Sequence, residues 1–270
     1  MRSDSKFTKE QLAKVHKRYL NGESITKIAK ENNVATDTIY RQFRRNGYKT
    51  IERTVMNRVY SLNETYFDEI DTEEKAYFLG LLYADGSHNL KKYCISLELQ
   101  EDDKPILDKL TTILQPDKPL FFNRKRKENH KNSYKFYVSS KYMSNRFSEL
   151  GIGQNKAFTI RLPELRNDLI HHFIRGFFDG DGCISTYLIK NKYQSCSFSI
   201  TSNKEFLEKI QEILIEQLKL NKTKLARDNR GNNINSLVYG GKQNCLKIRD
   251  WLYKDATVYL QRKHDKFYSI

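Results

Sequence analysis

The sequence lacks the features that would take a protein into or across a membrane. It has no apolar run long enough to span a bilayer and no secretory signal pattern at its basic N-terminus. Its four cysteines show no C-x-x-C spacing, which argues against a zinc site and suits a reducing compartment. We therefore expect a soluble, cytoplasmic protein with no membrane partner.

Acidic residues are scarce relative to basic ones. The chain has 33 Asp and Glu residues against 48 Lys and Arg residues, which gives a net charge of +15 and a pI near 9.5. An excess of this size indicates a polyanionic partner, and nucleic acid is the commonest polyanion that proteins bind.

Two short segments, 78–86 and 174–182, repeat one pattern. Each is an apolar, helix-like run with a glycine in its middle, Gly80 or Gly176, and each closes on a small residue, an aspartate and a glycine. A glycine inside a helix costs about 1 kcal/mol relative to alanine, so it needs a reason, and close approach of another helix is the usual one. The pattern predicts two helices packed backbone to backbone through these glycines.

The two aspartates of the pattern, Asp85 and Asp181, are our candidates for the chemistry. Each would sit at the negative end of a helix dipole, where a carboxylate is disfavoured unless a cation joins it. Two carboxylates held close together there would recruit a hard divalent cation such as Mg²⁺. The following Gly86 and Gly182 fit the left-handed position that ends a helix. A single copy would be read as a helix-ending Asp-Gly turn, but two copies favour a shared site.

At these residues the sequence resembles the LAGLIDADG family of homing endonucleases, in the single-chain type with two motif copies. The second copy is the closer match, with Asp179, Asp181 and Gly182 in place, although Arg175 replaces a small residue. In the first copy Tyr83 stands for the usual aspartate, at a position that does not bind metal in the family. No H-N-H-type or G-I-Y-type nuclease pattern is present.

The resemblance implies a site-specific endonuclease that hydrolyses both strands of DNA with Mg²⁺, or with Mn²⁺ in its place, and leaves 3′ overhangs. It further implies a metal site at the two motif ends and one lysine near each scissile phosphate. The residues assigned to the metal are Asp85, Asp181, Ala84 and Gly180. The catalytic lysines are assigned as Lys156 and Lys263, with Lys141 and Lys242 as second choices.

The rest of the chain indicates a duplication. Asp85 and Asp181 are 96 residues apart, and strands and helices recur after both at a similar offset. Each half is predicted as helix, strands, helix, strands, helix, which is an α+β unit. We expect a monomer with a pseudo-symmetric duplicated LAGLIDADG fold, whose halves span 71–162 and 163–270.

Basic residues cluster at equivalent places in the two halves, between the middle helix and the next strand. A β-ribbon with basic tips can lie in the DNA major groove. One such cluster alone is as often a solvated loop, but the symmetric placement favours DNA contact. The residues assigned to this contact are Arg124, Lys125, Arg126, Lys127, Lys135, Lys222, Lys224, Arg227 and Arg230.

Residues 1–50 form a separate module, joined to the rest by a segment, 51–70, that has no glycine or proline. The module has 12 basic against 5 acidic residues, and capping and apolar spacing predict three helices. It resembles a helix-turn-helix, although a small bundle for protein contact would give the same pattern. The residues assigned to the outer face of its third helix, and to DNA, are Thr38, Arg41, Gln42, Arg44 and Arg45.

Two other functions remain open at this stage. One is a DNA-binding regulator with this fold that has lost catalysis, although the presence of both aspartates argues against that loss. The other is a maturase that assists the splicing of intron RNA, since some proteins of the family do so. The helix-turn-helix favours duplex DNA over folded RNA, and therefore an endonuclease over a maturase. The resemblance implies intron homing as the role of such an endonuclease.

Overall fold

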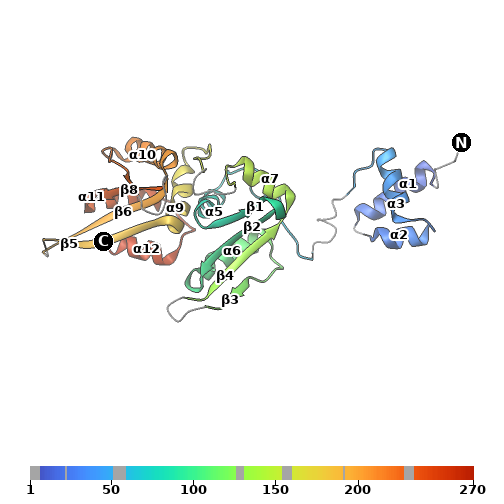
Figure 1. The fold of residues 1–270 in the computed structure, drawn as a ribbon, viewed down its shortest axis with the longest axis horizontal. Helices are drawn as coiled ribbons and strands as arrows, with labels where there is room; N and C mark the ends of the chain where they lie inside the picture. Colours follow the sequence, from blue (N-terminus) through green and yellow to red (C-terminus); the bar gives the residue numbers. More distant parts are fainter. Residues whose placement is uncertain are drawn as a thin grey trace. The chain divides into compact units, whose positions relative to one another are not determined.

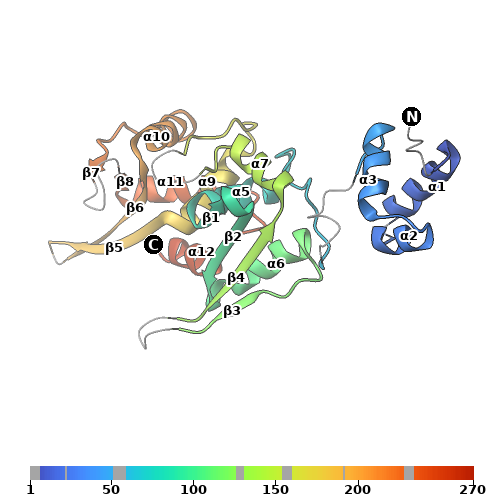
Figure 2. The same cartoon turned by 45° about the vertical axis from the view of Figure 1, so that its right-hand side comes forward.

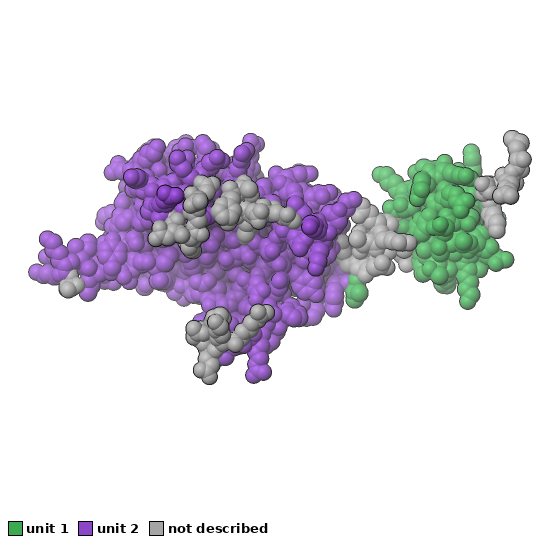
Figure 3. All heavy atoms as spheres, in the orientation of Figure 1, with its two compact units in different colours: residues 1–59 green, residues 60–270 purple. Residues whose placement is uncertain are grey.

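The chain divides into two units, residues 1–59 and residues 60–270 (Figure 3). The computed structural model describes residues 7–21, 23–50, 59–125, 131–153, 160–190, 192–227 and 234–270. Within those ranges no helix is both long enough and apolar enough to cross a bilayer.

The described part of the first unit contains three helices (Figure 1): α1 (Lys9–Leu20), α2 (Ile25–Glu31) and α3 (Thr36–Arg45). Thr8 begins α1 with a capping box, in which its hydroxyl accepts from Gln11 N at 3.2 Å and its own N–H donates to the Gln11 side chain at 2.9 Å. The three helices enclose a small core of their own, formed by Phe7, Leu12, Val15, Tyr19, Ile25, Ile28, Ala29, Ile39 and Phe43.

The second unit contains two copies of one α+β arrangement. The elements of the first copy are α5 (Glu73–Ala84), β1 (Gly86–Asn89), β2 (Cys94–Gln100), α6 (Lys104–Leu114), β3 (Phe121–Asn123), β4 (Ser133–Ser139) and α7 (Lys141–Glu149). Those of the second are α9 (Ile170–Asp181), β5 (Gly182–Ile189), β6 (Tyr193–Asn203), α10 (Lys204–Leu218), β7 (Ala226–Arg227), β8 (Ile234–Gly240), α11 (Lys242–Leu252) and α12 (Gln261–Tyr268).

The strands of each copy form an antiparallel sheet with the same order, β1-β2-β4-β3 in the first and β5-β6-β8-β7 in the second. The predicted fold class, a duplicated α+β unit preceded by an all-α unit, is confirmed.

Each sheet has one apolar face and one open face. In β6, Cys196, Phe198 and Ile200 are buried, while the serines between them are partly exposed. This alternation places every second side chain on the face that α10 and α11 cover. On the opposite face, β6 carries the small hydroxyl side chains of Ser195, Ser197 and Ser199.

The two motif helices, α5 and α9, lie side by side at the centre of the second unit (Figures 1 and 2). Their glycines face the partner backbone reciprocally. A Cβ added to Gly80 would be 2.0 Å from the carbonyl oxygen of Phe173, and one added to Gly176 would be 2.0 Å from that of Tyr77. Any side chain at either position would therefore push the helices apart.

The glycines that end the motifs differ from the prediction. Gly86 begins strand β1, and Gly182 is extended, with φ −94° and ψ 164°. The expected left-handed conformation is therefore wrong. Glycine is required here for space: a Cβ at Gly86 would be 2.4 Å from the carbonyl oxygen of Leu82, and one at Gly182 would be 2.1 Å from the Phe178 ring.

A buried ion pair joins the two copies beside the motif helices. Arg175, in α9, is fully buried and donates to Glu73 Oε1 at 2.7 Å and to the carbonyl of Leu252 at 2.8 Å. Glu73, at the start of α5, also accepts from Thr257 N at 2.6 Å. Burial opposes ionisation of Glu73, but the bonds from Thr257 and the charge of Arg175 outweigh it, so its pKa lies below its ordinary value.

The helix contact predicts a steric penalty for Gly80→Ala. Alanine would gain about 1 kcal/mol of helix propensity, but its Cβ cannot fit 2.0 Å from the Phe173 carbonyl. We expect a net loss of about 1–3 kcal/mol in the free energy of unfolding, measured by urea denaturation. The control is Gly153→Ala, where the added Cβ meets nothing within 4 Å. Equal stability of the two variants would contradict the packing described.

The ion pair predicts a second loss of stability. Glu73→Ala would leave the guanidinium of Arg175 buried without its carboxylate, and we expect the free energy of unfolding to fall by about 3–5 kcal/mol. The matched control removes an exposed pair: Asp108 lies 2.6 Å from Lys104, and Asp108→Ala should cost less than about 0.5 kcal/mol. Comparable losses from the two variants would show that the buried pair does not join the copies.

Candidate active site

The two motif aspartates end their helices near one point. Asp85 is the C-cap of α5, and Asp181 is the last residue of α9; both are exposed. A Cβ placed on Gly180 would be 3.1 Å from Asp85 Oδ2 and 2.4 Å from the Cβ of Ala84. The structure thus brings the carboxylate of Asp85 against the residue that precedes Asp181. It also brings together Ala84 and Gly180, the other two residues assigned to a metal.

The donors at this point fit a hard divalent cation. They are carboxylate oxygens at the negative ends of two helices. Across the described parts of the chain, no three His, Cys, Asp or Glu residues group as metal ligands. A cation here would therefore take few ligands from the protein, which is how Mg²⁺ binds when it keeps waters and substrate oxygens.

Lys263, in the first turn of α12, is next to the end of α9. Its Nζ donates to the carbonyl of Gly182 and lies 5.2 Å from the centre of the Phe178 ring. Burial, together with the charge of Arg262, lowers the pKa of Lys263, while the negative charges of Asp179 and Asp85 oppose this. The lysine is therefore a partly buried cation close to the carboxylates, and it loses its proton more easily than a surface lysine.

Asp179, two residues before Asp181, holds the beginning of the helix that carries Lys263. It is fully buried, and its Oδ2 accepts from the Tyr77 hydroxyl at 2.8 Å and from Leu260 N at 2.7 Å. Leu260 is the N-cap of α12, and its carbonyl accepts from Lys263 N at 2.9 Å. The sequence identifies Asp179 as a residue of the second motif, but it does not predict the hydrogen bonds from Tyr77 and Leu260, which anchor the start of α12.

Burial raises the pKa of Asp179 to about 6, although the bonds from Leu260 and Tyr77 and the charge of Arg175 favour the ionised form. The folded-state pKa is therefore above that of the unfolded chain. The folded protein binds more protons between the ordinary value of 3.8 and about 6, so this carboxyl destabilises the fold progressively as pH rises through that range.

The first copy makes an equivalent hydrogen bond, but here the motif side chain donates it rather than accepting it. Tyr83, which occupies the motif position of Asp179, donates its hydroxyl to the carbonyl of Leu150, just after α7. Burial raises the pKa of Tyr83 above its ordinary value, so the hydroxyl remains a donor. Lys156, the lysine assigned to this copy, lies outside the described residues.

The basic residues of the first copy gather at the edge of its sheet. A hollow of about 400 Å³ is lined by Arg124, Lys125 and Lys135 together with Glu98, Asn123, Lys131 and Ser133. Glu98 is held by neutral donors, since it accepts from Asn123 at 2.9 Å and from Ser133 at 2.6 Å. Arg126 and Lys127 lie outside the described residues.

The second copy has exposed basic residues at the corresponding edge. Lys222 and Lys224 follow α10, and Arg227 ends β7, which pairs with β8 as β3 pairs with β4. Arg230 lies outside the described residues. Lys141 and Lys242 begin α7 and α11, and both are exposed.

Four of the five residues assigned to the outer face of α3 are accessible: Arg41, Arg44 and Arg45 are exposed, and Thr38 is partly so. Gln42 is only 6% exposed, so its predicted outward position is wrong. It follows Ile39 by three residues and precedes Phe43, which places it on the buried stripe of the helix.

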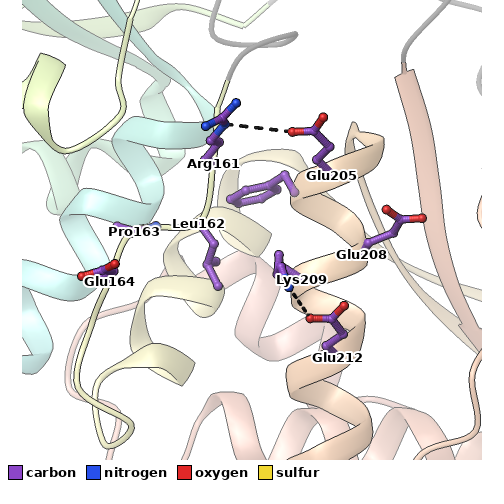
Figure 4. Close-up of a pocket in the computed structure, with 9 residues that line it drawn as sticks. Arg161, Leu162, Pro163, Glu164, Glu205, Glu208, Lys209 and Glu212 are labelled. Carbon is purple, nitrogen blue, oxygen red and sulfur yellow. Dashed lines mark hydrogen bonds and ion pairs between the residues drawn. The ribbon is translucent and has the colours of Figure 1, made fainter.

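A cavity beside α10 has the wrong charge for a nucleic acid. It has a volume of about 610 Å³, lies between residues 161–164 and α10, and carries four glutamates, of which Glu205 faces Arg161 and Glu212 pairs with Lys209 (Figure 4). None of the residues assigned to catalysis lines it. Four carboxylates would repel phosphates, so this cavity is separate from the site at the motif ends.

Residues 168–250, which include the second motif helix and its sheet, match the family described as LAGLIDADG-like domain. Residues 5–46 match the helix-turn-helix domain of resolvase. The predicted resemblances, to the LAGLIDADG family and to a helix-turn-helix, are thereby confirmed.

Solved structures similar to this chain include three LAGLIDADG proteins in complex with DNA. The meganuclease I-AabMI, bound to uncleaved DNA, is 12% identical with a TM-score of 0.48, covering 72% of this chain and 88% of its own. The homing endonuclease I-LtrWI, bound to target DNA, is 17% identical with a TM-score of 0.47, covering 72% and 87%. I-GzeII, in complex with its DNA target, is 14% identical with a TM-score of 0.48, covering 71% and 87%. No curated protein sequence matches this chain.

The Asp179 anchor predicts a graded loss of stability. Asp179→Ala would leave the Tyr77 hydroxyl and the Leu260 N–H buried without an acceptor, and we expect the free energy of unfolding at pH 7 to fall by about 2–5 kcal/mol. Asp179→Asn keeps one acceptor oxygen and should lose less than half as much in the same urea titration. Equal losses would show that these two hydrogen bonds contribute nothing beyond the volume of the side chain.

Proposed function

We propose that this protein is a site-specific, divalent-metal-dependent endonuclease that cuts both strands of duplex DNA. The observation that carries the proposal is the convergence of two exposed motif aspartates, Asp85 and Asp181, at the ends of two helices in backbone contact. The match of residues 168–250 to the LAGLIDADG-like domain supports this assignment of the second motif.

Asp85 and Asp181, with the preceding Ala84 and Gly180, are the residues that would hold the cation. A divalent cation at such a site supplies charge neutralisation for the phosphate and lowers the pKa of a bound water. The carboxylates meet from two copies of one arrangement, so each copy faces one strand of the duplex. Cutting both strands, with the 3′ overhangs that the family resemblance implies, follows from that symmetry.

Lys263 is the proposed positioning group on the side of the second copy. Its lowered pKa allows the neutral amine to accept a proton from water at Nζ, whereas the protonated form would hold a phosphate oxygen. Asp179 fixes the start of α12 and so keeps Lys263 near Gly182. Lys156 is proposed for the same role in the first copy.

The DNA would lie across the open faces of the two sheets, with the basic edges against the backbone. Arg124, Lys125 and Lys135 of one copy and Arg227 of the other would contact phosphates. The three exposed arginines of α3 would add a second contact. Because the two copies differ in sequence, the target is expected to be long and asymmetric, bound by one monomer.

The test is cleavage of a randomised duplex library in Mg²⁺ by the full chain. We expect double-strand cuts at one long site, and chelation of the metal should abolish them. Asp85→Asn and Asp181→Asn should each lower the cutting rate at least 100-fold or leave only nicks, while DNA binding changes less than tenfold. Mn²⁺ should restore cutting by the wild type after chelation.

The control is Asp108→Asn, which alters an exposed carboxylate on α6 that is already paired with Lys104. It should leave both cutting and binding unchanged. Tight, selective retention of DNA without any metal-dependent cut would instead identify a DNA-binding regulator. Preferential binding of intron RNA over duplex DNA, again without cleavage, would identify a maturase.

A further inference from the structure

The β5–β6 hairpin of the second sheet is longer than the corresponding β1–β2 hairpin of the first sheet. β5 and β6 pair over eight positions, from Gly182 with Ile200 to Ile189 with Tyr193. In the first copy β1 and β2 pair over only four, from Gly86 with Leu97 to Asn89 with Cys94. The four additional pairs lengthen the hairpin by roughly 13 Å at 3.3 Å per residue. Figures 1 and 2 show this hairpin extending beyond the rest of its sheet.

Three large apolar side chains are exposed together on the extension. On the open face, Tyr187 is 44% exposed, Ile189 45% and Tyr193 59%. The register places these three together, because Tyr187 pairs with Ser195 and Ile189 pairs with Tyr193. Nearer the motif helices the same face of this hairpin carries Cys183 and small hydroxyl residues, and Val238 of β8 is 37% exposed there. Apolar groups gathered at a hairpin tip indicate a surface that a partner covers.

The charge of the hairpin identifies the kind of partner. The sequence from 182 to 203 contains no acidic residue, and its two charged residues are Lys190 and Lys192, both exposed at the turn. Lys190 has φ 51°, which turns the chain there, and Lys192 Nζ lies 5.5 Å from the centre of the Tyr193 ring. An acid-free hairpin with cations at its tip is complementary to a polyanion.

An apolar face flanked by cations fits one feature of DNA in particular. A two-stranded β-ribbon fits into the major groove, and the C5-methyl of thymine is the one apolar group that base edges present there. Phosphates on either side would meet the lysines of the turn. Four additional strand pairs also match the length of about four base pairs, at 3.4 Å per step.

We propose that the open face of the β5–β6 extension, formed by Tyr187, Ile189 and Tyr193, recognises thymine methyl groups in the outer part of one half-site. This inference rests on the proposed function, because it assumes that DNA lies across the open faces of the sheets. It goes beyond it by naming the base and the chemical group that this hairpin selects. The first copy lacks this extension, since its β1 and β2 pair over only four positions.

The test begins with duplexes that the full chain selects from a randomised library in the presence of a chelator, which prevents cutting. The outer positions of one half-site should be enriched in thymine. Each of these thymines is then replaced by deoxyuridine, which removes the methyl group and leaves base pairing intact. We expect binding to weaken about fourfold for each contacted methyl, as removal of one buried methyl group predicts.

Variants on opposite faces of the hairpin provide the matched comparison. Ile189→Ser should lose the discrimination between thymine and deoxyuridine at the base that Ile189 contacts, and Ile189→Val should retain most of it. Leu188→Ser removes a side chain that is 59% exposed but alternates to the other face, so it should discriminate as the wild type does. Both positions are exposed, and circular dichroism would verify that each of the three variants is folded.

Three results would overturn the inference. Equal affinity of the wild type for thymine and deoxyuridine sites, with selective binding intact, refutes methyl recognition alone and leaves the proposed function standing. Self-association in sedimentation that Ile189→Ser abolishes would assign the surface to a second copy of the chain. Failure of the wild type to retain any duplex selectively would refute the proposed function and this inference together.

Discussion

The contact between two helix backbones is the constraint on which the second unit depends. Gly80 and Gly176 allow α5 and α9 to approach until each would-be Cβ lies 2.0 Å from a carbonyl oxygen of the partner. That separation places Asp85 beside the chain at Gly180 and positions both sheets on either side of the pair. A wider spacing would separate the carboxylates and remove the proposed cation site, because oxygen ligands must lie within about 2.0–2.6 Å of such an ion.

Local patterns predicted the features that depend on neighbouring residues. The interior glycines, the closing aspartates and the alternation of β6 are all readable from short segments, and they specify the duplicated fold. Two errors came from the same kind of reasoning. The glycines after the motifs were interpreted by turn chemistry, whereas contacts with Leu82 and Phe178 require them. Gln42 was assigned by its polarity, whereas helix spacing places it beside Phe43 on the buried stripe.

The parts of the site that escaped prediction depend on residues far apart in the chain. Asp179 bonds to Leu260, 81 residues away, and to Tyr77, 102 residues away. No periodicity connects such positions, so the anchor of α12 is visible only in three dimensions. The target sequence is harder still, because base selection combines many side chains on two open faces with the deformability of the DNA itself.

The buried ion pair also bears on whether the second copy alone could form a symmetric homodimer in place of the duplicated chain. In a symmetric homodimer of the second copy, Leu169 would stand where Glu73 now accepts from Arg175, and Phe173 where Tyr77 donates to Asp179. Two guanidinium groups and two carboxyl groups would then be buried at one interface without these partners, which is strongly unfavourable. In this chain the two copies are complementary, because Glu73 and Tyr77 of the first supply partners that Arg175 and Asp179 of the second require.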